Sequence, residues 1–160
     1  MIILGIDPGL ATIGYGVIKV KNGLKCLKYG VIETPPLLLK EKRLRKIYLE
    51  VSKLLRKYNP KILAVENVYF FKNAKTITSV SEAKGVILLA AAKKKIKIQE
   101  IPPPQVKMIV CGYGRAKKKQ IEKKVKRILK LKEIPKPDDA ADALAIAICY
   151  SKLKKSTRGA

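Results

Sequence analysis

The sequence predicts one α/β domain, a five-stranded mixed sheet flanked by helices. Its 160 residues suit a single domain of ordinary size. Hydrophobic residues make up 48% of the chain, which is enough for a packed core. Strand-like and helix-like segments follow one another in the order βββαβαβα, which is typical of a sheet with helices on its faces.

Strands are expected where short apolar runs end at turn residues. Pro8-Gly9 and Asn22-Gly23 supply the first two turns, so the first three strands are predicted to form an antiparallel meander. Two further apolar runs, each bounded by a proline, complete the sheet. The predicted strands span 2–7, 14–20, 24–33, 61–66 and 96–101.

Helices are expected where apolar residues recur three or four positions apart. The first spans 38–58, with Leu44, Ile47, Val51 and Leu55 on one face. Others are predicted at about 78–95, 104–110 and 116–131 and from about 139 onward. The chain becomes basic from Lys152, so we expect fraying there, a single folded domain over 1–153 and a disordered basic tail over 154–160.

The charge balance predicts a polyanionic partner. Lys and Arg number 36 against 12 Asp and Glu, and the formal net charge is +24. A small domain with this charge repels itself, and nucleic acid neutralises it with release of counterions. A lysine-rich, heat-adapted surface is the alternative, but such surfaces are normally enriched in Glu as well. We therefore expect nucleic-acid binding, with which heat adaptation is compatible.

Scarce residue types exclude several kinds of site. The chain has no His, which rules out Ser–His and Cys–His nucleophiles and imidazole metal ligands. Cys26, Cys111 and Cys149 form no CxxC pair, so we expect neither disulfides nor zinc, and a reducing, cytoplasmic setting. No apolar run reaches about 18 residues and no secretory signal is apparent, so no membrane partner is expected.

The few acidic residues predict the chemistry. Asp7 and Glu66 each end a hydrophobic strand, at the sheet edge where α/β proteins bind ligands. Asp139 and Asp142 share a face of the last helix, which is so apolar that a carboxylate buried there needs a cation. These four acids are hard oxygen ligands suited to Mg²⁺ or Mn²⁺. A pair of such ions supports phosphodiester hydrolysis without a His base.

Each acid also has a purely structural interpretation. Asp7 can belong to an ordinary turn, and Glu66 can simply end its strand. Asp138 or Asp139 can cap the last helix, and Asp142 can interact with the helix dipole. We expect Asp138 to be a cap or a bystander. We expect the other four to act together, because four independent coincidences would otherwise be needed.

These segments together resemble the RuvC family of Holliday-junction resolvases, which belongs to the ribonuclease H-like superfamily. The resemblance rests on Asp7-Pro8-Gly9, on Glu66 and on the run DAADALAIA at 139–147. The basic segments QVK at 105–107 and GYGRAKK at 112–118 also match the family. The similarity extends over essentially the whole chain, so it implies a ribonuclease H-like fold.

The resemblance implies a crossover junction endodeoxyribonuclease that acts in recombination and DNA repair. Such an enzyme is a homodimer that binds four-way junction DNA, nicks two opposed strands symmetrically and leaves 5′-phosphate and 3′-hydroxyl ends. It works with the RuvA–RuvB branch-migration complex. The implied cofactor is Mg²⁺, two ions per active site, for which Mn²⁺ substitutes. The implied catalytic residues are the metal ligands Asp7, Glu66, Asp139 and Asp142 together with Lys107 and Lys118.

DNA contacts are expected from aromatic and basic residues. Tyr69 stands where the family usually has a Phe that stacks on a base, and Phe70 is a second candidate. Packing beneath the loop is the alternative for these aromatics. The helix at 116–131 has one apolar face and cationic others, and a solvated face is the alternative for most of its lysines. The expected DNA-binding residues are Tyr69, Phe70, Lys75, Lys107, Arg115, Lys117, Lys118 and Lys119.

Two symmetric cuts need two active sites, which favours a two-fold dimer. The apolar stretch 86–92 is either the seam of that dimer or a core helix. Three rival functions are a non-catalytic nucleic-acid-binding module, an actin-like ATPase or sugar kinase suggested by Asp7-Pro8-Gly9, and a ribonuclease acting on RNA–DNA hybrids. The last is the closest rival within the fold.

Overall fold

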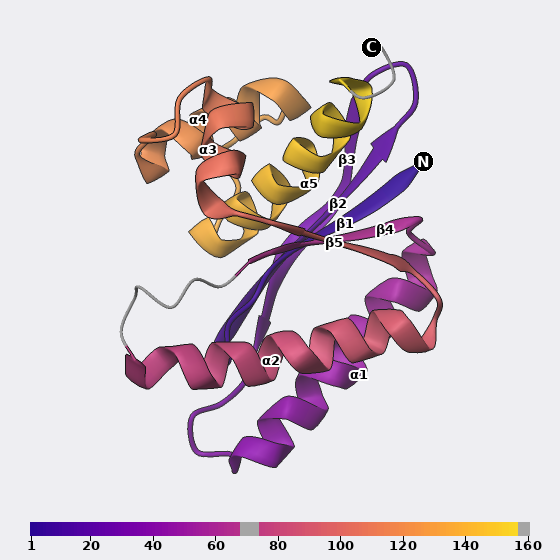
Figure 1. Cartoon of the computed structure of the whole chain (residues 1–160), viewed down its shortest axis with the longest axis vertical. Coiled ribbons are helices and arrows are strands. Elements are labelled where there is room, and N and C mark those ends of the chain that lie inside the picture. The colour runs from indigo at the N-terminus through magenta and orange to yellow at the C-terminus, as the bar shows by residue number, and fades with distance from the viewer. Residues whose placement is uncertain (68–73, 157–160) are drawn as a thin grey trace.

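The predicted sheet is present, with its strands in the order β3–β2–β1–β4–β5 (Figure 1). The structure, a computed structural model, describes residues 1–67 and 74–156, of which 74, 75, 155 and 156 are described by their backbone alone. The first three strands form the expected antiparallel meander, while β4 runs parallel to both β1 and β5. The strands are β1 (Ile2–Asp7), β2 (Thr12–Val20), β3 (Leu24–Glu33), β4 (Ile62–Glu66) and β5 (Lys97–Ile101).

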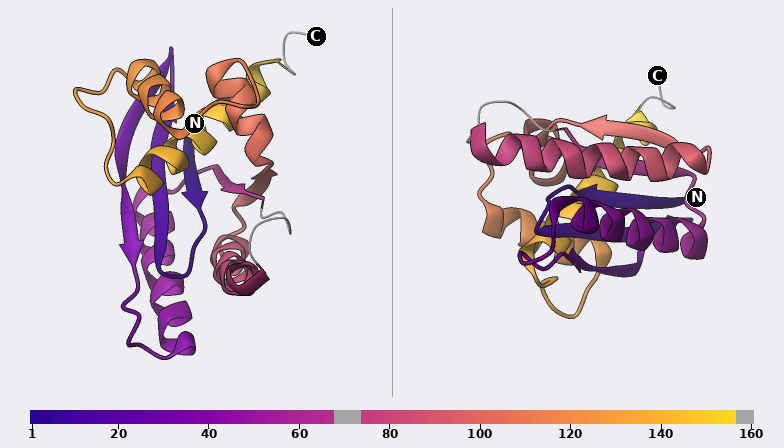
Figure 2. Two further views of the ribbon diagram at one scale, coloured as in Figure 1. Left: turned by 90° about the vertical axis from the view of Figure 1, so that its left-hand side faces the viewer. Right: turned by 90° about the horizontal axis from the view of Figure 1, so that it is seen from below.

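Helices cover both faces of this sheet. Two of them lie side by side on one face, and the other three described helices cover the opposite face (Figures 1 and 2). The first pair comprises α1 (Lys40–Tyr58) and α2 (Ala74–Lys93). The second group comprises α3 (Pro103–Cys111), α4 (Lys118–Leu129) and α5 (Asp138–Ser156). None of the described helices is both long and apolar enough to cross a bilayer.

Strand β1 is apolar along its length because both of its faces are covered. Leu4 and Ile6 pack toward the α1–α2 layer, whereas Ile3 packs toward the layer of α3, α4 and α5. Each of these three side chains is at most 1% exposed. A strand between two helical layers therefore has no polar face, which explains the near-continuous apolar runs of the sequence.

Helix α5 lies very close to the sheet because glycines of β1 and β2 face it. A Cβ added to Gly5 would fall 2.1 Å from the Ala143 carbonyl oxygen. A Cβ added to Gly14 would fall 2.0 Å from the Asp139 carbonyl oxygen. Gly14 is paired with Asp7 across the strands β1 and β2. The first turn of α5 is therefore held over the end of β1.

The structure differs from the prediction mainly at the ends of elements. Strand β2 begins at Thr12 rather than 14, and α2 begins at Ala74 rather than about 78. Helix α5 continues to Ser156, although we expected fraying from Lys152 and a tail from 154. The side chain of Leu153 packs against the core and Lys154 Nζ lies 3.7 Å from the Met1 sulfur, so the basic end stays helical. Residues 157–160 lie outside the described part.

Candidate active site

The strand register brings Asp7 and Glu66 together. Ile6 of β1 is paired with Val65 of β4 in a parallel arrangement. The following residue of each strand is an acid, so Asp7 and Glu66 leave the sheet side by side at the same edge. Both are half-buried. The juxtaposition expected from the sequence therefore follows from parallel pairing.

Helix α5 adds two more acids to this edge. Its first turn lies over Gly14, beside Asp7, and carries Asp139. One turn later Asp142 faces a pocket, with 26% of its side chain exposed. The surrounding residues of α5 are buried almost without exception between 140 and 150, so the helix cannot rotate these acids away without exposing its core face.

The charges of the other three acids act on Asp7. Burial raises the pKa of Asp7, and the charges of Glu66, Asp142 and Asp139 raise it further, to about 8, against a smaller opposing effect of Lys118. Burial also raises the pKa of Asp142, although the nearby Lys118 ammonium counteracts this. The raised pKa of Asp7 therefore has two causes: burial, which disfavours the charged carboxylate, and the like charges of the neighbouring acids, which the Lys118 ammonium only partly offsets.

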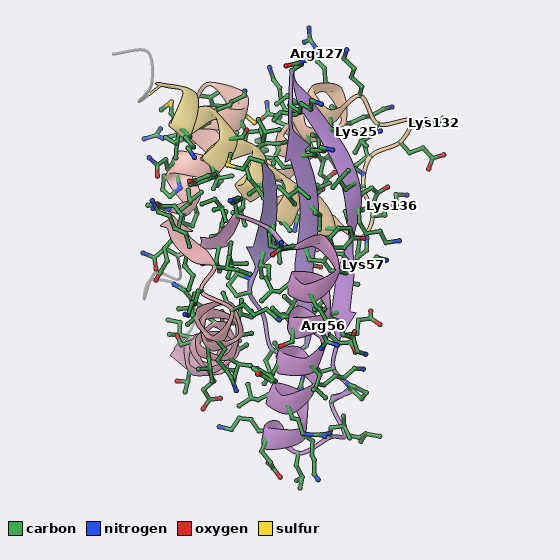
Figure 3. The ribbon with its side chains drawn as sticks, turned by 90° about the vertical axis from the view of Figure 1, so that its right-hand side faces the viewer. Lys25, Arg56, Lys57, Arg127, Lys132 and Lys136 are labelled. Atoms are coloured by element: carbon green, nitrogen blue, oxygen red, sulfur yellow. The ribbon has the colours of Figure 1, made fainter. Side chains whose placement is uncertain are left out.

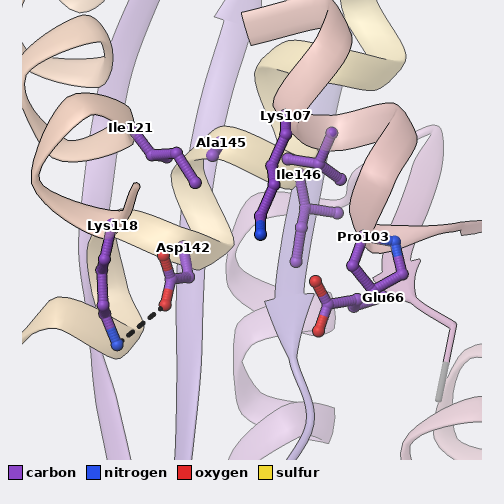
Figure 4. A pocket seen from close by; sticks show the side chains of 9 residues that line it. Glu66, Pro103, Lys107, Lys118, Ile121, Asp142, Ala145 and Ile146 are labelled. Carbon is purple, nitrogen blue, oxygen red and sulfur yellow. Dashed lines mark ion pairs between the residues drawn. The ribbon is translucent and has the colours of Figure 1, made fainter. Parts of the chain in front are cut away.

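A pocket of about 290 Å³ opens beside these acids, between the end of β4 and helices α3, α4 and α5. Glu66 and Asp142 face it from opposite sides, and Lys107 of α3 extends its ammonium group into the space between them (Figure 4). Lys118 of α4 lies on the Asp142 side. The remaining lining is mostly apolar: Pro103, Val106, Ile121, Ala145 and Ile146.

Lys118 links α4 to α5, two of the three helices that flank the pocket. Its Nζ lies 2.5 Å from Asp138 Oδ2 and 3.3 Å from Asp142 Oδ2. Asp138 therefore is not the bystander we considered. It keeps a capping contact, since its Oδ1 accepts a hydrogen bond from the Asp139 backbone N–H at 3.2 Å. Its pKa is lowered chiefly by its hydrogen bond with Lys118.

The donor set fits a hard divalent cation. Carboxylate oxygens without His or Cys are the ligands that Mg²⁺ and Mn²⁺ prefer, and Glu66, Asp139 and Asp142 add like charge to the buried Asp7. In the part of the chain that the structure describes, no three acidic, Cys or His side chains converge tightly enough to form a finished metal cage. Like charges repel, and Asp142 is instead paired with Lys118.

The other predicted DNA-binding residues are distributed around the pocket or fall outside the description. Arg115 and Lys117 are exposed on the segment leading into α4, and Lys119 is exposed in its first turn; none of the three lines the pocket. Tyr69 and Phe70 lie outside the described residues. So does the side chain of Lys75, although its backbone belongs to α2.

One supporting residue was not predicted. Lys84 of α2 is only 11% exposed in its side chain, and it forms an ion pair with Glu100 of β5. Its Nζ also lies 3.1 Å from Asn67 Oδ1. Asn67 follows Glu66 directly, so this contact braces the end of β4. No local pattern distinguishes Lys84 from the many solvated lysines of the chain.

The chain resembles known proteins over almost its full length. Residues 3–150 match the family model described as Crossover junction endodeoxyribonuclease RuvC. The crossover junction endodeoxyribonuclease RuvC of Natranaerobius thermophilus is 52% identical over 153 residues, which cover 95% of each chain.

Solved structures agree with this assignment. Thermus thermophilus RuvC has a TM-score of 0.92 at 32% identity, covering 98% of this chain and 97% of that one. A structure of Thermus thermophilus RuvC in complex with a Holliday junction substrate has a TM-score of 0.93 at 33% identity, covering 98% and 96%. The expected ribonuclease H-like fold is thus confirmed, and the chain belongs to the RuvC family of crossover junction endodeoxyribonucleases.

Proposed function

We propose that this chain is a crossover junction endodeoxyribonuclease that resolves Holliday junctions in recombination and DNA repair. Membership of the RuvC family supports the activity and the substrate. The observation that carries the proposal is that acids from β1, β4 and α5 meet at one edge of the sheet, next to a pocket with two lysines, in a protein whose net charge is +24. Such a site attracts a polyanion only together with cations that neutralise its acids.

The proposed metal ligands are Asp7, Glu66, Asp139 and Asp142, and the proposed cofactor is Mg²⁺, two ions per active site, with Mn²⁺ as a substitute. Bound Mg²⁺ supplies the charge that activates water and stabilises the leaving oxygen. The protein's part is to hold the carboxylates in place before DNA arrives, since all four stand on elements anchored in the core.

The lysines of the pocket act on the DNA strand. Lys107 points between Glu66 and Asp142, where its ammonium can pair with a phosphate drawn to the acids (Figure 4). Lys118 approaches the same space from α4. Arg115, Lys117 and Lys119 are exposed beside it and are positioned to contact phosphates further along the strand. Phosphate contacts of this kind position DNA without reading its sequence. Tyr69, Phe70 and Lys75 complete the proposed DNA-binding set.

We propose a homodimer, because two opposed nicks require two active sites. The stretch 86–92 contributes both to the core and to the surface of α2. Ile87, Ala90 and Ala91 are buried in the core, whereas Leu89 is 55% exposed on the outer side of α2. Leu49 of the neighbouring α1 is 40% exposed. These two leucines make the outer side of the α1–α2 layer the proposed seam. Cooperation with the RuvA–RuvB complex and a cytoplasmic location complete the proposal.

Cleavage of defined substrates tests the activity. Purified protein is incubated with a four-way junction, a linear duplex and an RNA–DNA hybrid, with and without Mg²⁺. We expect paired nicks in the junction only when Mg²⁺ is present, and resealing of the products by ligase, which needs 5′-phosphate and 3′-hydroxyl ends. Cleavage of the hybrid without cleavage of the junction would overturn the proposal. The Asp7→Asn variant controls for a contaminating nuclease.

A further inference from the structure

Lys118 forms two ion pairs that the proposed chemistry does not require. Lys118 is the first residue of α4, where the helix dipole disfavours a cation, and the first turn of α4 has no acid to offset it. Both of its carboxylate partners, Asp138 and Asp142, come from α5. The position of this ammonium group is thus set by the neighbouring helix.

The two partners differ in what they face. Asp142 lines the pocket and belongs to the proposed metal ligands. Asp138 has half of its side chain exposed, and it stands outside the pocket lining. The shorter contact, 2.5 Å against 3.3 Å, is the one to Asp138. Lys118 therefore bridges Asp138, which faces solvent, and Asp142, which faces the pocket. Figure 4 shows the contact with Asp142.

The carboxylate of Asp138 is itself oriented. One oxygen, Oδ1, accepts a hydrogen bond from the backbone N–H of Asp139 at 3.2 Å, which ties it to the start of α5. The other oxygen, Oδ2, receives Lys118. An ion pair exposed to this degree contributes little to stability. Its effect is to restrict where the long lysine side chain can go.

We propose that Asp138 is a positioning residue that holds Lys118 at the mouth of the pocket. If a divalent cation held Asp142, Lys118 would lose that contact but keep its ion pair with Asp138, and so would stay within reach of the DNA strand. This inference rests on the proposed function, because it assigns a role to Lys118 in that same site. Without Asp138, Lys118 would depend on Asp142 alone and compete with the metal for it.

The first test measures binding of Mn²⁺ alone to DNA-free protein, by the electron paramagnetic resonance of the free ion. Removing a negative charge near the proposed metal site weakens metal binding whether or not Asp138 positions Lys118. A double-mutant cycle is therefore needed to separate the part of the effect that acts through Lys118. We expect Asp138→Asn to weaken Mn²⁺ binding by about threefold more in the native background than in the Lys118→Met background. An equal loss in both backgrounds would overturn the proposal.

The second test separates rate from affinity. Under single-turnover conditions at saturating protein, we expect Asp138→Asn to slow junction cleavage by about tenfold. Its junction affinity, measured with Ca²⁺ in place of Mg²⁺, should stay within about twofold of wild type. Asp138→Glu keeps the carboxylate and should restore most of the rate. An unchanged rate in Asp138→Asn, or parallel losses of rate and affinity, would overturn the proposal.

Glu50→Gln is the matched control. Glu50 of α1 pairs with Lys53 at 2.6 Å, has 37% of its side chain exposed and lies outside the pocket lining, so this variant removes the same charge from a comparable ion pair. We expect it to behave as wild type in both tests. If wild-type protein itself fails to cleave junctions with Mg²⁺, the proposed function fails. If wild type cleaves and Asp138→Asn behaves like Glu50→Gln, only the positioning role fails.

Discussion

The charged form of Asp7 is costly in the folded protein, first because the carboxyl group is buried and then because three other acids act on it. Its pKa is raised from 3.8 to about 8, first by burial and then by Glu66, Asp142 and Asp139. Between these pH values the unfolded chain has lost a proton that the folded protein still binds. The free energy of unfolding contributed by this group therefore falls as the pH rises through that window. Near neutral pH the site destabilises the metal-free protein.

Asp7→Asn removes this cost. We expect the variant to raise the free energy of unfolding of the metal-free protein by about 1–2 kcal/mol at pH 7.5, with little change near pH 4. Urea denaturation followed by circular dichroism at both pH values measures this. Mg²⁺ should stabilise the wild type more than the variant, because the variant lacks a proposed ligand. A variant less stable than wild type at pH 7.5 would contradict the interpretation.

Thr34 shows how one buried hydroxyl supports the turn that follows Asp7. It is 3% exposed, and its Oγ1 donates a hydrogen bond to the Leu10 carbonyl oxygen at 2.5 Å. The same oxygen accepts a hydrogen bond from Arg43 Nε at 2.8 Å. The turn after β1 is thereby linked to the first residues of α1.

Thr34→Val keeps the shape of the side chain and removes the two hydrogen bonds of the hydroxyl, to the Leu10 carbonyl oxygen and from Arg43 Nε. We expect it to lower the free energy of unfolding by about 1–3 kcal/mol. Thr34→Ser retains the hydroxyl and should lose clearly less. Urea denaturation of the two variants side by side makes the comparison. A Thr34→Val variant as stable as wild type would show that the hydrogen bonds do not matter at this position.

The packing of α5 on the sheet is what aligns two of the proposed ligands with the other two. The helix contributes alanines and the strands contribute glycines, so the backbones approach until a single Cβ would collide with a carbonyl oxygen. At Gly5 and Gly14 no strand side chain lies between the sheet and α5. The positions of Asp139 and Asp142 are therefore set by backbone contacts of the core.

Gly5→Ala should disrupt this contact. Because the added Cβ would lie 2.1 Å from the Ala143 carbonyl oxygen, α5 must shift, and we expect a loss of about 3 kcal/mol or more in the free energy of unfolding. Gly85→Ala in α2 is the control, since nothing lies within 4 Å of its added Cβ. We expect that variant to gain about 0.5–1 kcal/mol from helix propensity. If Gly5→Ala left the free energy of unfolding unchanged, α5 would be able to move away from the sheet at no cost.

Positive charge covers more of the molecule than the pocket. Lys25, Arg56, Lys57, Arg127, Lys132 and Lys136 project on the side bordered by the edge strand β3 (Figure 3). None of these residues lines the pocket. Their electrostatic field extends about 8–10 Å at physiological salt. They therefore attract DNA from a distance but do not contact it at the pocket.

Two triple variants separate long-range electrostatic attraction from direct phosphate contacts. One reverses Lys25, Arg56 and Lys132 to Glu, and the other reverses Arg115, Lys117 and Lys119 to Glu, so both carry the same net charge. We expect the second to lose far more junction affinity, with the slope of log K against log salt shallower by roughly 0.9 for each phosphate contact removed. Fluorescence anisotropy over a salt series measures the slopes. Equal slopes would mean that total charge alone governs binding.

Local patterns in the chain were sufficient to predict the order of the elements and the meeting of Asp7 with Glu66. Strands covered on both faces are apolar throughout, and parallel strands end at one edge, so both results depend only on periodicity and pairing. The resemblance to the RuvC family added the fold and the activity. Helix α5 ran beyond its expected end because Leu153 finds a place on the core, a contact that no basic run reveals.

The pairings of Lys118 with Asp138 and of Lys84 with Asn67 were beyond such reasoning. Each joins side chains of different elements, and each depends on how closely those elements pack. In a chain so rich in lysine, every lysine has the same local appearance. Whether one is solvated or held beside a carboxylate is settled by the distance between packed elements, which only the folded core defines.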